Sequence, residues 1–193
     1  MRLIIRILLI VVVAFLAFVF TRPSTFHIER SATINAPASV IYAQLENFHN
    51  FAAWSPWEHL DPAMKKEFSG PESGVGASYS WAGNSKAGEG RMTITDAHPT
   101  DKLVMKLEFL KPFKATNTAT FALAPDGAGT KVTWSMDGTN NFMAKAFGVF
   151  MNMDKMVGGD FERGLAQLKM VCEVSPSLGN AVPRQADSTG TSH

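Results

Sequence analysis

Apolar and polar side chains alternate over several short segments of the sequence, and this period of two constrains the fold more than any other feature. The clearest segment is KLVMKLEFL at residues 102–110, where Leu103, Met105, Leu107 and Phe109 share one side. Lys102, Lys106 and Glu108 are on the other side. Because residues two apart in a strand lie on the same face, this segment predicts a strand with one buried and one solvated face.

Similar patterns recur along most of the chain and predict a sheet. The other expected strands cover residues 26–34, 64–69, 76–83, 88–99, 113–123 and 130–138. The turn residues PDGAG at 125–129 indicate a hairpin between the last two strands. One-sided strands joined by short turns imply an antiparallel sheet with one solvated face.

Two helical patterns accompany the expected sheet. Pro37 suits the first turn of a short helix that extends to Phe48. A long helical pattern covers residues 141–171, and Gly158 and Gly159 each cost about 1 kcal/mol relative to alanine there, which predicts a kink or break. Because the sheet and the long helix must each bury an apolar face, the predicted fold is α+β, with a curved antiparallel sheet wrapped around the C-terminal helix.

An apolar run, LIIRILLIVVVAFLAFVF, occupies residues 3–20 and is interrupted only by Arg6. As a helix it spans about 27 Å, close to the ~30 Å hydrocarbon thickness of a bilayer. A cleaved signal peptide shows a similar pattern, but the bulky residues 18–20 stand where cleavage needs small ones. We therefore expect an uncleaved, single-pass transmembrane anchor over residues 1–22.

Charges around the apolar run indicate its orientation. Arg2 and Arg6 precede most of the run and Arg22 follows it, so the positive-inside rule places the N-terminus in the cytoplasm and the following domain outside it. That domain is expected over residues 23–173. The tail at 174–193 lacks apolar periodicity and is rich in Ser, Gly, Pro and Thr, which predicts disorder.

Composition narrows the possible partners. The formal net charge is +1, which gives no support for nucleic-acid binding. The histidines show no metal-binding spacing, and the single cysteine, Cys172, excludes a multi-thiolate site, so neither a metal nor another cofactor is expected. Oligomeric state is left open by the sequence.

Seven segments, taken in order, resemble the SRPBCC superfamily of START-like, helix-grip proteins, and more narrowly its polyketide cyclase/dehydrase-like branch. They are INAP at 34–37, FAAWSPW at 51–57, GPESGVGASYSWAGN at 70–84, GEGRMTI at 88–94, LEFLKPF at 107–113, GTKVTWSMDG at 129–138 and MDKMVGGDFERGLAQLK at 153–169. The resemblance covers roughly residues 26–172. It implies an apolar cavity between the sheet and the long helix for a lipid, polyketide or other hydrophobic small molecule, in a fold of which only some members are enzymes.

Large side chains on the expected inward faces are the candidate ligand-binding residues. They are Trp54, Trp57, Tyr79, Trp81, Met92, Met105, Phe109, Asn117, Phe121, Trp134, Met136, Phe150, Met153 and Phe161. From periodicity alone such a set is more typical of a filled core, whereas the resemblance favours a cavity. Asn117 falls on the apolar face, where its amide either bonds within the protein or offers a polar contact to a ligand.

Acid–base candidates follow the aromatic stretch NFAAWSPW at 50–57. Glu58, His59 and Asp61 could face the mouth of a cavity and act in a cyclisation or dehydration. Solvated loop residues are the alternative. The sequence thus predicts a membrane-anchored binding protein for a hydrophobic small molecule or lipid, with a cyclase/dehydratase enzyme or an interaction module with a filled core as alternatives.

Overall fold

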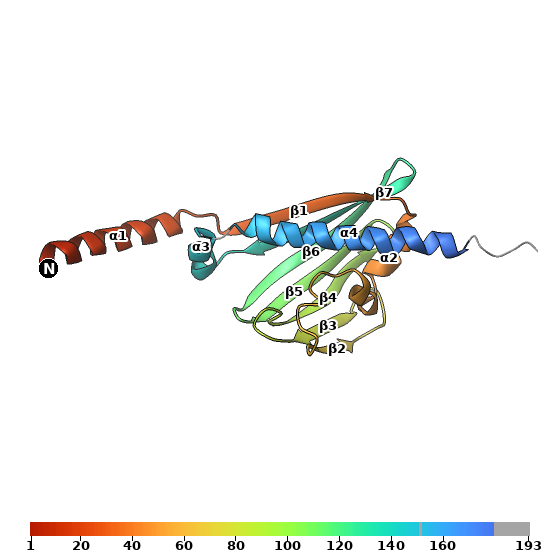
Figure 1. The fold of residues 1–193 in the computed structure, drawn as a ribbon, viewed down its shortest axis with the longest axis horizontal. Coiled ribbons are helices and arrows are strands. Elements are labelled where there is room, and N and C mark those ends of the chain that lie inside the picture. Colours follow the sequence, from red (N-terminus) through yellow and green to blue (C-terminus); the bar gives the residue numbers. More distant parts are fainter. Residues whose placement is uncertain (151, 180–193) are drawn as a thin grey trace, which may run out of the picture.

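The computed structural model describes residues 1–150 and 152–179, and its domain is a seven-stranded sheet that curves around a long helix (Figure 1). The strands are β1 (Thr25–Ile34), β2 (Lys65–Ser69), β3 (Ser78–Ala82), β4 (Glu89–His98), β5 (Lys102–Lys111), β6 (Ala115–Asp126) and β7 (Gly129–Thr139). The helices are α1 (Arg2–Phe20), α2 (Ala38–Leu45), the 3₁₀ helix η1 (Phe48–Ala53), α3 (Phe142–Gly148) and α4 (Met153–Gly179).

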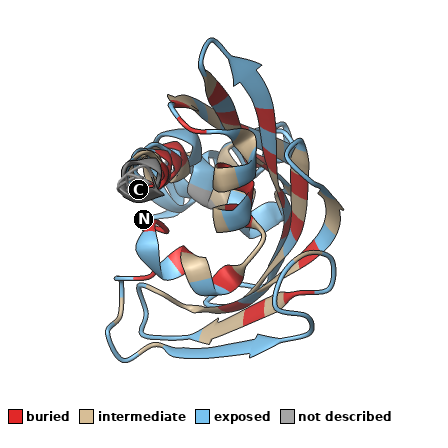
Figure 2. Cartoon of the chain, turned by 90° about the vertical axis from the view of Figure 1, so that its right-hand side faces the viewer, coloured by how far each residue is buried: buried red, intermediate tan, exposed pale blue. Residues whose placement is uncertain are grey.

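All neighbouring strands pair antiparallel, in the order β1-β7-β6-β5-β4-β3-β2. The alternation in the sequence appears directly as burial. Along β6, Asn117, Ala119 and Phe121 are buried, whereas Thr118 and Ala122 are exposed. The sheet is strongly curved, and α2 and α4 fill its concave side (Figure 2). The predicted α+β helix-grip architecture is therefore confirmed.

Helix α1 projects from one end of the sheet as a separate rod (Figure 1). It is followed by only four residues, 21–24, before β1 begins. At this end α3 lies against it, with the Phe20 and Phe142 rings 5.4 Å apart and the Phe15 and Phe150 rings 6.0 Å apart. We call the end of the sheet where β1, β4 and β6 begin the α1 end, and the other the opposite end.

The C-terminal helical pattern is broken at a different place from the one predicted. Helix α4 runs straight through Gly158 and Gly159, so the expected kink there is wrong. The break lies earlier, between the end of α3 at Gly148 and the start of α4 at Met153, and Asn152 caps α4 by accepting a hydrogen bond from the Lys155 amide over 2.9 Å. The helix also extends to Gly179, past the predicted start of the tail at 174; residues 180–193 lie outside the described residues.

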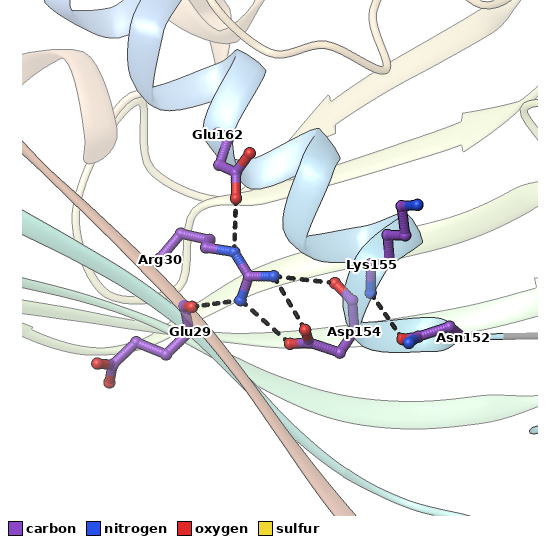
Figure 3. A network of polar contacts seen from close by, with 6 residues as sticks. All are labelled: Glu29, Arg30, Asn152, Asp154, Lys155 and Glu162. Atoms are coloured by element: carbon purple, nitrogen blue, oxygen red, sulfur yellow. Dashed lines mark hydrogen bonds and ion pairs between the residues drawn. The ribbon is translucent and has the colours of Figure 1, made fainter.

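The glycine at 158 allows an arginine of β1 to cross the helix. A Cβ atom added to Gly158 would meet the Arg30 guanidinium at 2.2 Å. Arg30 donates through Nε to Glu162 over 2.8 Å and through Nη1 and Nη2 to the Asp154 carboxylate over 3.1 and 3.0 Å (Figure 3). It also donates to the Glu29 and Asp154 carbonyls. These hydrogen bonds lower the pKa of Asp154 and fasten the first turns of α4 to β1.

Candidate functional site

A cavity of about 240 Å³ lies between the concave face of the sheet, α4 and the segment that joins η1 to β2. Its walls are predominantly aromatic and aliphatic. The lining residues are Phe51, Trp54, Ser55, Trp57, Glu58, Leu60, Met64, Tyr79, Trp81, Lys86, Ala87, Met92, Met105, Leu107, Phe109, Ala119, Phe121, Trp134, Met136, Val157, Asp160 and Phe161. An apolar wall with a few polar groups is the usual composition of a small-molecule site.

Most of the side chains that the sequence singled out meet at this cavity. All of the predicted ligand-binding residues line it except Asn117, Phe150 and Met153. Leu107 and Ala119 also line it and were not selected, although strand alternation had placed both on the inward face. Lys86 and Asp160 gave no signal in the sequence, because a turn and a helix 74 residues apart bring them to the same opening.

Asn117 is buried, but it lies beside the cavity lining rather than in it. Its Nδ2 approaches the Met136 sulfur at 3.7 Å, and its Oδ1 would be 2.3 Å from a Cβ atom added to Gly138. Gly138 is directly opposite Asn117 in the pairing of β6 with β7, and its missing side chain makes room for the amide on the buried face of the sheet. Of the two roles considered for Asn117, contact within the protein is the one that the geometry supports.

Phe150 and Met153 were predicted to face inward, and the structure places them at the surface instead. Their exposures are 78% and 43%. Phe150 follows the end of α3 at Gly148 and lies outside the helical phase of α4, with its ring toward Phe15 of α1, whereas Met153 lies in the exposed first turn of α4. Phe113 likewise is 60% exposed, because β5 ends at Lys111 and the alternation does not continue through the turn at 112–114.

The aromatic stretch at 50–57 forms the inner wall of the cavity. Asn47 caps η1 by accepting a hydrogen bond from the His49 amide, and Trp54 Nε1 donates to the Gln44 carbonyl over 3.3 Å. The Trp134 ring stacks on Phe161 with centroids 4.2 Å apart and meets the Trp57 ring edge-on at 5.5 Å. These contacts fill part of the interior with side chains and leave the remaining space beside them.

A buried carboxylate reaches the cavity wall. Glu58 Oε1 accepts a hydrogen bond from the Tyr79 hydroxyl over 2.8 Å, and Oε2 pairs with the Lys66 ammonium group. The Glu58 side chain is 7% exposed and that of Lys66 is 30% exposed. Burial, together with the hydrogen bond to Glu58, raises the pKa of Tyr79, so that its hydroxyl remains a donor. A carboxylate accepts about four hydrogen bonds, so acceptor capacity remains for a ligand.

The other two acid–base candidates do not join Glu58. His59 is exposed and is absent from the lining. The Asp61 carboxylate accepts hydrogen bonds from the Ala63 and Asn84 amides, at 3.0 and 2.7 Å, which fixes the loop beside the cavity. Within the described residues, no three His, Cys, Asp or Glu side chains gather in a way that could hold a metal ion.

Several solved structures share this fold. A Chromobacterium violaceum protein, CV1439, superposes with a TM-score of 0.55 at 15% identity, covering 79% of this chain and 99% of that one. A Nitrosospira multiformis protein gives a TM-score of 0.55 at 19% identity, with the same coverage of 79% and 99%. DynU16, from the dynemicin biosynthetic locus, gives 0.53 at 14% identity, covering 77% of this chain and 48% of that one.

The comparison by sequence family is specific, whereas no curated protein matches the chain. Residues 25–173 match the family model described as polyketide cyclase / dehydrase and lipid transport, so the match covers the whole sheet and α4 as far as residue 173. This range agrees with the extent of the resemblance seen in the sequence. The chain therefore belongs to the polyketide cyclase / dehydrase and lipid transport family, with the SRPBCC type of ligand-binding fold.

Proposed function

We propose that this protein is a membrane-anchored binding protein for a small hydrophobic molecule that carries a hydrogen-bond donor. The observation that supports this function best is the apolar cavity with the Glu58 carboxylate in its wall. Aromatic rings and methionines would hold the apolar part of the ligand. A hydroxyl or amine group of the ligand would donate to Glu58, which is already oriented by Tyr79 and Lys66.

The volume of the cavity limits the size of what it encloses. A volume of 240 Å³ equals roughly eight water volumes at about 30 Å³ each and lies just below the usual ~300–1,000 Å³ of ligand sites. A single ring or a short acyl chain fits this space, and a longer molecule would extend through the opening. A space of this size supports binding of a small ligand, whereas an interaction module with a filled core would need no such space.

Helix α1 supports the anchor. It has 19 residues, nearly all of them apolar, and almost none of them are buried within the protein. At 1.5 Å per residue it reaches about 28 Å, enough to cross a hydrocarbon layer. The proposal keeps this helix as an uncleaved span with the domain on the extracytoplasmic side, consistent with Arg2 and Arg6 at its start.

Calorimetric titration of the full chain in lipid nanodiscs tests the role of Glu58, with empty nanodiscs as the blank. The probes are 4-ethylphenol and ethylbenzene, which differ by one hydroxyl group. In Glu58→Leu we expect 4-ethylphenol to lose at least tenfold in affinity relative to ethylbenzene. The reason is that a hydrogen bond to a charged group contributes about 1.5–3 kcal/mol. His59→Leu, a change at the exposed neighbour, should leave the ratio of the two affinities as in the wild type.

Two results would count against the proposal. If the ratio of the two dissociation constants were unchanged in Glu58→Leu, Glu58 would not take part in ligand recognition. If neither probe, nor any of a panel of short alcohols and acids, bound the wild-type chain, the cavity would not be a ligand-binding site.

The position of Glu58 also favours a second function, catalysis of proton transfer in a cyclisation or dehydration. The carboxylate would accept a proton from a ligand carbon next to a carbonyl group, while Lys66 and Tyr79 hold it in place. Phenylacetone in D₂O provides a direct assay, because its α-protons exchange for deuterium only after removal. If the protein is a catalyst, the wild-type chain should exchange these protons at least tenfold faster than Glu58→Gln. Equal rates in the two proteins would leave binding as the function.

A further inference from the structure

Exposed apolar side chains gather at the α1 end of the domain. The group consists of Leu60, Leu110, Phe113, Phe142, Met143, Phe150, Met153 and Met156, whose exposures run from 38% to 78%. We call this group the apolar rim. It belongs to four separate parts of the chain: the segment before β2, the β5–β6 turn, α3 with the residues after it, and the first turn of α4. Apolar groups that several elements present together at one end mark an interaction surface.

The chain geometry holds the apolar rim close to the anchor. Four residues between α1 and β1 span at most about 14 Å when fully extended. Contacts between Phe20 and Phe142 and between Phe15 and Phe150 place α3 directly beside the last turns of α1 (Figure 1). When α1 crosses a bilayer, these contacts bring α3 to the level where the hydrocarbon meets the headgroups.

The cavity opens at the same end. Its deep lining residues, such as Met105 and Phe121, are almost completely buried, whereas Leu60 and Lys86 are exposed and Asp160 is partly so. Lys86 lies in the turn between the end of β3 and the start of β4, both at the α1 end. Leu60 is common to the cavity lining and the apolar rim, so the two are continuous.

Charge is distributed as a lipid surface requires. Exposed lysines at the α1 end are Lys86, Lys111, Lys114 and Lys155. Two acidic side chains there are engaged, Glu89 by Lys111 and Asp154 by Arg30. At the opposite end the exposed charges are mixed, with Glu72, Asp101 and Asp126 beside Lys131. Each lysine held at an anionic membrane contributes about 1 kcal/mol of attraction.

We infer that the apolar rim docks on the bilayer surface, so that the cavity opens onto lipid and a hydrophobic ligand passes between bilayer and cavity without crossing water. Met143 of α3 and Leu110, at the end of β5 on the outer face of the sheet, would insert among the headgroups, with the lysines facing anionic lipid. This inference rests on the proposed function, because it takes α1 as the membrane anchor. It adds an orientation of the domain and a route for the ligand.

Fluorescence quenching by doxyl-labelled lipid tests the docking. The full chain is placed in nanodiscs with one-quarter anionic lipid and carries one dye on Lys114→Cys at the α1 end or on Glu72→Cys at the opposite end. Cys172 is completely buried, and burial raises the pKa of its thiol to about 11, so it does not take up the dye under native conditions. We expect strong quenching at position 114 and little at position 72.

Glutamate substitutions in the rim supply the decisive comparison. The double substitution Leu110→Glu and Met143→Glu should reduce quenching at position 114 at least twofold. Val75→Glu, at an apolar side chain of comparable 59% exposure near the opposite end, should leave it unchanged. Equal quenching at positions 114 and 72, or no effect of the rim substitutions, would overturn the docking. Release of the chain from membranes by alkaline carbonate would instead reject the anchor, and the proposed function with it.

Discussion

Replacing Ala119 by leucine should raise the dissociation constant of 4-ethylphenol at least tenfold while leaving the fold intact. Ala119 lines the cavity from β6, between Met105 of β5 and Met136 of β7 in register. The added carbon atoms would occupy space that the ligand needs. Because each buried methylene contributes about 0.8 kcal/mol, we expect unchanged or higher stability, by roughly 1–2 kcal/mol.

Ala122→Leu provides the matched control, since Ala122 lies on the exposed face of the same strand. It should bind the probe as the wild type does. Calorimetry gives the affinities, and the melting temperature measured by circular dichroism shows whether each variant remains folded. A wild-type affinity in Ala119→Leu would place the ligand outside this cavity.

Replacing Gly158 by alanine should lower stability, although alanine is the better helix former. A methyl group at 158 would overlap the Arg30 guanidinium, which would have to shift and weaken its hydrogen bonds to Asp154 and Glu162. Overpacking costs about 1–3 kcal/mol, against a gain of about 1 kcal/mol in helix propensity. In an Arg30→Ala background the overlap is gone, so the same substitution should become stabilising by about 1 kcal/mol.

Gly159 offers the control one residue away. A Cβ atom there would meet only the Arg163 side chain, at 3.8 Å, so Gly159→Ala should raise the melting temperature in both backgrounds. The test is a double-mutant cycle: the melting temperatures of the wild type, Gly158→Ala, Arg30→Ala and the double variant are measured on the full chain in one detergent. If Gly158→Ala raised stability in the wild type, the arginine contact would not explain this glycine.

Local sequence patterns predicted the fold well where burial alone determines structure. The alternation in residues 102–110 and 113–123 is sufficient to identify β5 and β6 and their inward faces, because one-sided burial leaves a period of two. Most of the cavity lining follows from the same rule. This explains why Met105, Phe121 and Trp134 could be selected before any contact was known.

The remaining errors involve positions where a distant residue decides the outcome. From the sequence, Gly158 predicted a kink. In the structure this glycine makes room for the side chain of Arg30, which is 128 residues earlier in the chain. Phe150 fits the helical period, yet the cap at Asn152 takes it out of phase with α4. Glu58 could not be separated from His59 and Asp61 by sequence, because only the pairing with Tyr79 and Lys66 distinguishes its environment.

The pairing of β1 with β7 has a consequence for how the chain matures. Thr25 is opposite Thr139, so the first strand to leave the ribosome has its partner 114 residues further along the chain. The contiguous hairpins from β2 to β7 pair through local contacts, whereas β1 and β7 must close a long loop. The N-terminal edge of the sheet is therefore the part whose pairing carries the largest loop-closure entropy.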